Sequence, residues 1–152
     1  MPQHKLEIPI FSPAAAKDAA SLGAHRIELN AAGSYPVGGL TPSLSELSAL
    51  LAQLGQQSPR IPIRIMIRPR GAPGAPGQPD FIYSAPELAS MRDAIAGFKA
   101  SGLLDAGRGD GFVFGALLHR TADGHGAVAV DVPSNSDLVT LARPFPDLPD
   151  FS

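Results

Sequence analysis

Three short segments of this chain alternate apolar and polar side chains. They are Leu6–Ile10, Arg26–Asn30 and Ile63–Ile67, and an alternation with a period of two is typical of a β-strand. In the third segment the isoleucines at 63, 65 and 67 share one face, whereas Arg64 and Met66 share the other. Each segment therefore predicts a strand whose apolar face must be buried under another element.

A helix signal follows each of these segments. Ser12 and Pro13 predict a helix start whose Ala-rich run ends at Gly23. Two capping boxes, Ser43-x-x-Glu46 and Ser84-x-x-Glu87, predict the next two helices. A fourth unit is predicted from a short apolar strand over residues 111–115 and a helix over residues 134–142. Because no hairpin signal separates these units, the sequence predicts a parallel sheet.

The polar faces of the strands carry charges, and these charges decide between the two folds that a parallel sheet forms. A doubly wound sheet has helices on both faces, and its strands are continuous apolar runs. Charged faces are better accommodated in a barrel lumen, where the charges can pair and reach the open end; the residues are Glu7, Arg26, Glu28, Arg64 and Arg68. We therefore predict an α/β protein of the (βα) TIM-barrel type, a single domain over residues 1–152 with a Pro/Gly-rich loop insertion over residues 71–80.

The length of the chain fits only part of such a barrel. A complete barrel of eight units takes about 250 residues, and the 152 residues here supply roughly four units. Half a barrel exposes two unpaired strand edges and its own lumen, which is unfavourable in water. We expect either a homodimer that closes the ring, or a fragment or miscalled gene product.

Composition excludes several classes of function. The chain has 12 Lys and Arg against 14 Asp and Glu, with no basic run, so we expect no nucleic-acid partner. It has no Cys, which removes disulfides, thiolate catalysis and Cys-based metal sites and suits a reducing compartment. No apolar stretch reaches the roughly 20 residues that span a bilayer. We expect a cytoplasmic protein with no membrane partner.

Five segments form a specific combination of motifs: GAHRIELN (23–30), GGLTPS (38–43), MIRPRG (66–71), DFIYS (80–84) and GDGFVFG (109–115). In this order and spacing they resemble the CutC family of copper homeostasis proteins, from about Leu6 to about Pro146. The resemblance implies a cytoplasmic TIM barrel that is often dimeric. It also implies a role in copper tolerance, with copper(I) bound through cysteines.

This chain departs from the family pattern in two places. Relatives often have Cys just after the first-strand Glu and just after RIEL, where this chain has Pro9 and Asn30. The resemblance therefore implies copper(I) as a ligand, while the usual thiols are missing. A TFHRAF-like strand follows the fourth helix in the family, whereas RPF is followed here by PDLPDFS; this favours truncation.

The charged residues of the predicted lumen are the candidates for chemistry. We place Glu7, Glu28 and Arg68 toward the carboxyl ends of adjacent strands, where barrel active sites lie, as candidate catalytic groups. A small anion could be bound there by side-chain and backbone donors; the candidates are Arg68, Arg70, Gly71, Gly39 and Thr41. A salt-bridge network that only holds the barrel together explains the same charges, since buried charges need partners.

Candidate metal ligands are few. Met66 is a soft sulfur on the lumenal face that could meet copper(I), although a lone Met is usually core packing. His119, Asp123 and His125 are close in sequence, but their spacing matches no standard zinc pattern and suits a solvated turn.

Three hypotheses about function follow. The first is a copper homeostasis protein, as the resemblance implies. The second is a TIM-barrel enzyme that binds a small anionic metabolite, to which no reaction can be assigned. The third is an inactive truncated product.

Overall fold

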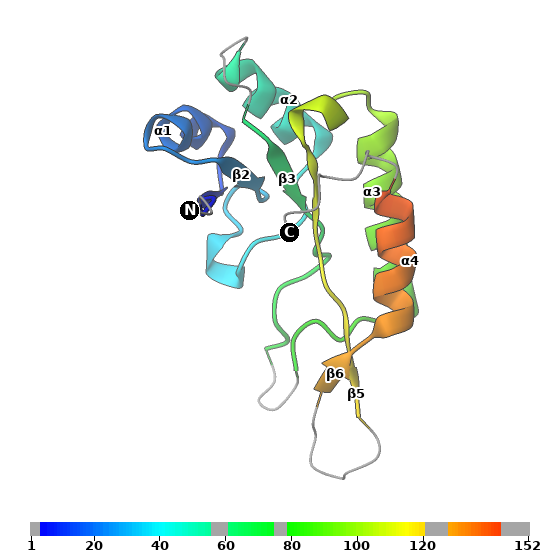
Figure 1. Ribbon diagram of the computed structural model, residues 1–152. Helices are drawn as coiled ribbons and strands as arrows, with labels where there is room; N and C mark the ends of the chain where they lie inside the picture. The colour runs from blue at the N-terminus through cyan, green and yellow to red at the C-terminus, as the bar shows by residue number, and fades with distance from the viewer. Residues whose placement is uncertain (1–3, 56–60, 75–78, 121–127, 144–152) are drawn as a thin grey trace.

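The computed structural model describes residues 4–55, 61–74, 79–120 and 128–143, and the structural statements below concern these residues. Its centre is a parallel sheet in the order β1-β2-β3-β4 (Figure 1). The strands are β1 (Glu7–Ile10), β2 (Arg26–Leu29), β3 (Ile63–Met66) and β4 (Gly111–Val113). Within the described residues β1 and β4 each pair with one neighbour, so they form the two edges of the sheet.

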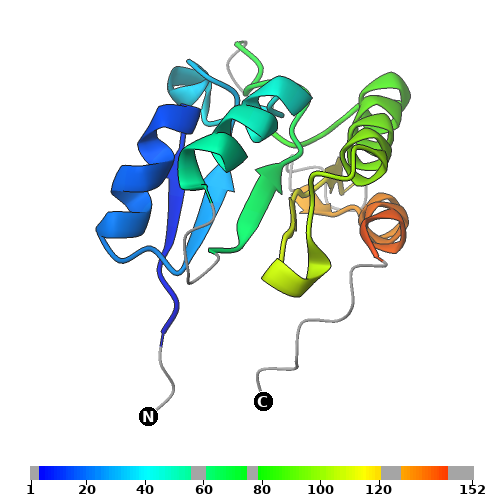
Figure 2. The same cartoon turned by 90° about the horizontal axis from the view of Figure 1, so that it is seen from above.

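The first three helices join successive strands, and a fourth follows the last. They are α1 (Ala16–Ser21), α2 (Leu44–Leu54), α3 (Ala85–Ala100) and α4 (Val132–Ala142). Three 3₁₀ turns accompany them: η1 (Pro13–Ala15), η2 (Tyr35–Val37) and η3 (Ala106–Arg108). Figure 2 shows the helices along the outside of the curved sheet. The predicted run of strand and helix units is confirmed.

One apolar core lies between the sheet and the helices. Ile27 and Leu29 of β2 and Ile63 and Ile65 of β3 are fully buried there, together with Ile67. They pack in one cluster with helix residues that recur at three- and four-residue spacing; these include Leu47, Leu50, Met91, Ile95 and Phe98. The opposite face of the sheet carries the charged residues, and we call it the lumenal face.

The helix signals are also confirmed. Ser43 and Ser84 each accept a hydrogen bond from the backbone N–H of the glutamate three residues on, and each glutamate accepts one in return. Ser12 caps a 3₁₀ turn before α1, because Pro13 and the two alanines form η1 first.

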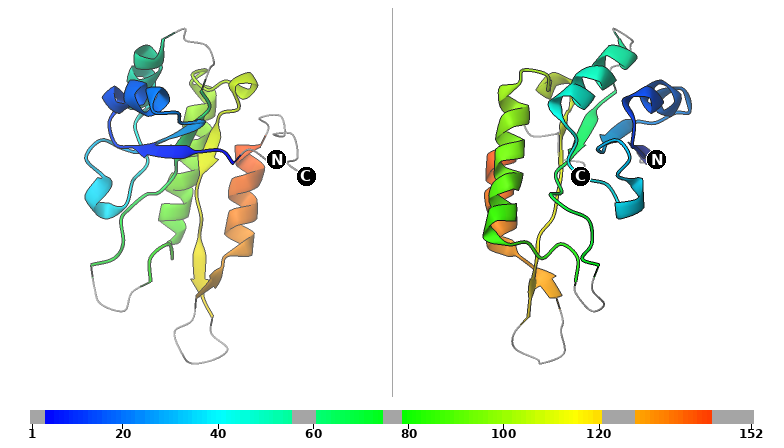
Figure 3. Two further views of the ribbon diagram at one scale, coloured as in Figure 1. Left: turned by 60° about the vertical axis from the view of Figure 1, so that its left-hand side comes forward. Right: turned by 180° about the vertical axis from the view of Figure 1, so that it is seen from behind.

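A hairpin that no sequence signal predicted lies between β4 and α4. Strands β5 (Leu117–His119) and β6 (Val128–Val130) pair antiparallel as a separate two-stranded sheet (Figure 3). Each strand has three residues, too few for a pattern of alternation to stand out from chance. The backbone of Leu117 donates to the carbonyl of Phe81 at 2.9 Å, so the hairpin is attached to the segment before α3.

None of the helices in the described residues is long and apolar enough to cross a membrane.

Candidate functional site

The register of the sheet sets the order of side chains along the lumenal face. In the strand register Glu7 lies opposite Arg26 at the start of β1 and β2, and Glu28 lies opposite Arg64 further along. Because the side chains alternate, Met66 and Arg68 follow Arg64 on the same face. The polar residues thus run in sequence from the amino ends of the strands to their carboxyl ends.

Glu7 does not lie at the carboxyl ends, where the sequence pattern places it. It is the first residue of β1, and its Oε2 atom lies 2.8 Å from Nε of Arg26, which opens β2. Both residues stand first in their strands, so this ion pair closes the amino end of the lumen and lies away from the carboxyl ends. Glu7 is therefore removed from the candidate catalytic group.

Arg64 is held at mid-height in the lumen. Its Nη1 atom donates to the carbonyl of Gly109 at 2.8 Å. A side chain at Gly111 would overlap the guanidinium in this position, so the glycine leaves room for it. Burial lowers the pKa of Arg64, with a further lowering by the nearby positive charge of Arg26. Arg64 therefore spans the gap between β3 and β4 as a structural cation.

Arg68 is the most buried charge at the carboxyl end, with 5% of its surface exposed. Its Nη1 atom donates to the carbonyls of Val37 at 2.7 Å and Gly39 at 3.0 Å, and its Nη2 atom donates to Asp80 at 2.5 Å. The Phe81 ring stacks on its guanidinium, 5.0 Å from Cζ to the ring centroid. Arg68 thus fixes the loops after β2 and β3 to the strand end.

The other donors of the predicted anion site are also used within the chain. Arg70 donates from Nε to Glu87 at 2.6 Å and from Nη2 to the carbonyl of Ile82 at 2.6 Å. The Thr41 hydroxyl donates to the carbonyl of Arg68 and accepts from its N–H. Gly71 allows close approach of Val37, whose Cβ would lie 2.8 Å from an added Cβ. These groups lie together, but their hydrogen-bond donors are already bonded to other groups of the chain.

Glu28 and Asn30 form the central part of the site. Asn30 is 1% exposed, and its Nδ2 atom donates to Oε1 of Glu28 at 3.0 Å. The half-buried Glu28 has no cationic partner among the described residues. Gly39, with a φ of +89°, packs directly on Asn30 Oδ1, and any Cβ at this position would overlap that oxygen. Gly39 thus lets the loop after β2 close over Asn30.

Aromatic side chains line the edge of the site. Phe81 is 37% exposed and has a left-handed backbone, with φ of +62°, which is unfavourable for a bulky residue. Its N–H donates to Oδ1 of Asp80 at 2.7 Å, which helps to hold this conformation. Tyr83 lies edge-on to Phe81, and burial raises the pKa of its hydroxyl.

Sequence reasoning missed Asn30, Asp80, Phe81 and Tyr83 as members of the site. Three of them lie in the segment DFIYS at 80–84, which contributed to the resemblance. The signal was therefore present, but the contact of Asp80 with Arg68 crosses a loop whose path no local pattern specifies.

The candidate metal ligands do not form a site. Met66 lies on the lumenal face of β3, whereas His119 ends β5 in the separate hairpin. Asp123 and His125 lie outside the described residues. No group of three His, Cys, Asp or Glu that could hold a metal ion occurs in the part of the chain that the structure describes. Copper(I) prefers thiolate and thioether ligands, and one lumenal thioether is a poor match.

The geometry defines a class of protein. A parallel sheet with helices on one face and a charged lumenal face on the other is the architecture of a TIM barrel, here as a partial barrel. The crystal structure of CutC from Streptococcus agalactiae has this fold, with a TM-score of 0.64 and 24% identity over 92% of this chain and 55% of that one.

The sequence comparisons give the family. A model of the CutC family matches residues 4–147. The copper homeostasis protein cutC homologs of Mus musculus and Homo sapiens are both 38% identical over 141 residues, 93% of this chain. A homolog from Caenorhabditis elegans is 34% identical over 144 residues. The chain belongs to the CutC family. It spans 42% of the length of the mouse and human relatives.

We expect this chain to bind copper(I) weakly. Titration with copper(I) against a competing chelator should show no stoichiometric site tighter than about 1 μM, because the described residues offer no cluster of soft ligands.

A double variant, Pro9→Cys with Asn30→Cys, is the matched positive control. Pro9 lies in β1 and Asn30 directly follows β2, and by alternation both lie on the lumenal face. Two thiols at these positions would supply soft ligands for a tight site. A tight one-to-one site in the unmodified chain would contradict the prediction.

Proposed function

We propose that this chain contributes a small-molecule site at the carboxyl ends of its parallel strands, with Glu28 as the group that binds the ligand and exchanges a proton with it. The observation that carries this proposal is the state of Glu28, which is half-buried and has no cationic partner among the described residues. Barrel active sites lie at this end. A carboxylate oriented by one amide and free of a counter-ion suits acid–base work.

The charges around Glu28 favour a ligand that donates hydrogen bonds. The two arginines nearest the carboxyl end already pair with carboxylates: Arg68 with Asp80, and Arg70 with Glu87. The unmatched group is therefore the negative charge of Glu28. A hydroxyl or ammonium group of a small polar metabolite complements it, and the exposed aromatic ring of Phe81 offers an apolar contact beside it.

A small anionic metabolite is the second candidate ligand. The observation that favours it is Nε of Arg68, which is buried and finds no hydrogen-bond partner among the described residues. The Phe81 ring lies over the same guanidinium, with its centroid 5.0 Å from Cζ.

Under this proposal the chain acts in copper homeostasis by binding a small metabolite and does not bind copper(I) directly. The absence of Cys from the sequence and the scattered Met and His residues support this separation.

The test compares three probes by ligand-observed NMR: glycerol as a polyol, ethanolamine as an ammonium and malate as a dicarboxylate. We expect glycerol or ethanolamine to bind at the carboxyl end and to bind about tenfold or more weakly to Glu28→Gln, because a hydrogen bond to a charged acceptor is lost.

Asp93→Asn is the matched control for this variant. It removes the same charge from an exposed position on α3 and should leave binding unchanged. Preference for malate would favour the anionic alternative. Equal binding to wild type and Glu28→Gln would overturn the role given to Glu28.

A further inference from the structure

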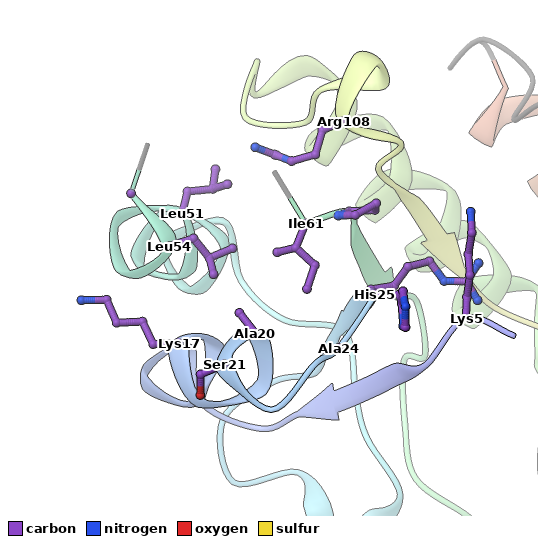
Figure 4. A pocket seen from close by; sticks show the side chains of 13 residues that line it. Lys5, Lys17, Ala20, Ser21, Ala24, His25, Leu51, Leu54, Ile61 and Arg108 are labelled. Atoms are coloured by element: carbon purple, nitrogen blue, oxygen red, sulfur yellow. The ribbon is translucent and has the colours of Figure 1, made fainter. Parts of the chain in front are cut away.

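A second candidate site lies at the opposite end of the sheet from Glu28. A cavity of about 560 Å³ opens at the amino ends of the strands, between α1 and α2 (Figure 4). This volume lies in the range that takes a small organic ligand. We call it the N-terminal cavity; the lining residues that bear on binding are Lys17, His25, Arg108, Leu51, Leu54 and Ile61.

The ionisable side chains that line the N-terminal cavity are all basic. Every ionisable residue that lines it is a lysine, arginine or histidine, and no carboxylate is among the described residues of its lining. Arg26 is paired with Glu7 at 2.8 Å, and Arg108 is paired with Asp110 at 2.5 Å. The carbonyl ends of α1 and α2 also lie at this end and offset part of the positive charge.

Lys17 and His25 keep donors for a ligand. The Lys17 ammonium forms no hydrogen bond or ion pair with the residues that the structure describes, and it is exposed. Nδ1 of His25 accepts a hydrogen bond from the backbone N–H of Leu6 at 3.0 Å. The proton of the neutral ring is therefore on Nε2, which is left as a donor.

An apolar wall accompanies these donors. Leu51 and Leu54 come from α2 and Ile61 from the segment before β3, and all three are half-buried against the core. Figure 4 shows Lys17, His25 and Arg108 on different sides of Leu54 and Ile61. A bare inorganic anion would leave this wall in contact with water, whereas an uncharged apolar ligand would leave the donors of Lys17 and His25 without a partner.

We propose that the N-terminal cavity binds an amphipathic organic anion, with its acid group near the cationic side chains and its apolar body along Leu51, Leu54 and Ile61. The site is separate from the one proposed around Glu28, because it lies at the other end of the strands.

The experiment measures decanoate binding to the 152-residue chain by isothermal titration calorimetry, with inorganic phosphate and decanol as probes of the head and the tail alone. We expect one decanoate site and clearly weaker binding of phosphate and of decanol. Lys17→Glu should weaken decanoate binding about tenfold, since a favourable charge becomes a repulsive one at an exposed position that does not support the core.

Two control variants test whether decanoate binds in this cavity. Arg143→Gln removes a positive charge from an exposed residue outside the cavity and should bind decanoate as wild type does. Glu28→Gln should also bind decanoate as wild type does. A loss of decanoate binding in Lys17→Glu alone therefore tests this cavity independently of the role proposed for Glu28. Equal decanoate affinity in wild type and Lys17→Glu, or phosphate binding as tight as that of decanoate, would overturn the inference.

Discussion

Replacing Arg68 with alanine is expected to lower the free energy of unfolding by about 3–5 kcal/mol, because it leaves the partly buried carboxylate of Asp80 with only a 3.9 Å contact to Arg70. The substitution removes the donors to the carbonyls of Val37 and Gly39 and to the carboxylate of Asp80. It also removes the cation under the Phe81 ring. Since a whole domain has about 5–15 kcal/mol of stability, the effect is a large fraction of the total. Urea unfolding followed by circular dichroism measures it.

Two further variants make this prediction specific. Arg68→Lys keeps the charge but cannot donate to two carbonyls and a carboxylate in the same geometry. We therefore expect its free energy of unfolding to lie between those of wild type and Arg68→Ala. Arg143→Ala removes an arginine from an exposed position and should change stability by less than about 0.5 kcal/mol. A loss below about 1 kcal/mol for Arg68→Ala would show that the guanidinium does not hold the strand end together.

Gly39→Ala is the second large effect that we expect, with a loss of about 3 kcal/mol from backbone strain and steric overlap together. The backbone φ of +89° is unfavourable for any residue with a Cβ, and the new methyl group would overlap Oδ1 of Asn30. Asn30 cannot easily move aside, because it is buried and its amide is bonded to Glu28. Thermal or urea unfolding measures the loss.

Gly23→Ala is the matched control for the steric part. Its φ of +92° is almost the same, but a Cβ added at this position would have no atom within 4 Å. Gly23→Ala should therefore lose only the free energy due to backbone strain, about 1 kcal/mol. Equal losses for the two variants would show that contact with Asn30 contributes nothing.

Local patterns predicted the elements well where the pattern was long. The alternation of isoleucine with Arg64 and Met66 identified β3 and both of its faces, because a strand buried on one side must alternate. The capping boxes at Ser43 and Ser84 fixed the starts of α2 and α3, because the two reciprocal hydrogen bonds depend only on residues three apart.

Local patterns failed where few residues or long connections were involved. The hairpin of β5 and β6 was missed because each strand has only three residues, too few for an alternation of side chains to be recognised. Glu7 was placed at the wrong end of the lumen because alternation gives the face of a residue but not its height in the sheet. That height is set by the register with β2.

The sequence by itself determined that strands and helices alternate, which strand face is apolar, that the chain has no thiol, and that its motifs are those of a CutC protein. These features follow from side-chain chemistry and from contacts between residues close in the chain. The tertiary structure alone decided which charges neutralise one another: Arg68 with Asp80, Arg70 with Glu87, and Glu28 with no cation among the described residues. Such pairings depend on how separate loops approach each other in space, and this packing is a property of the whole fold.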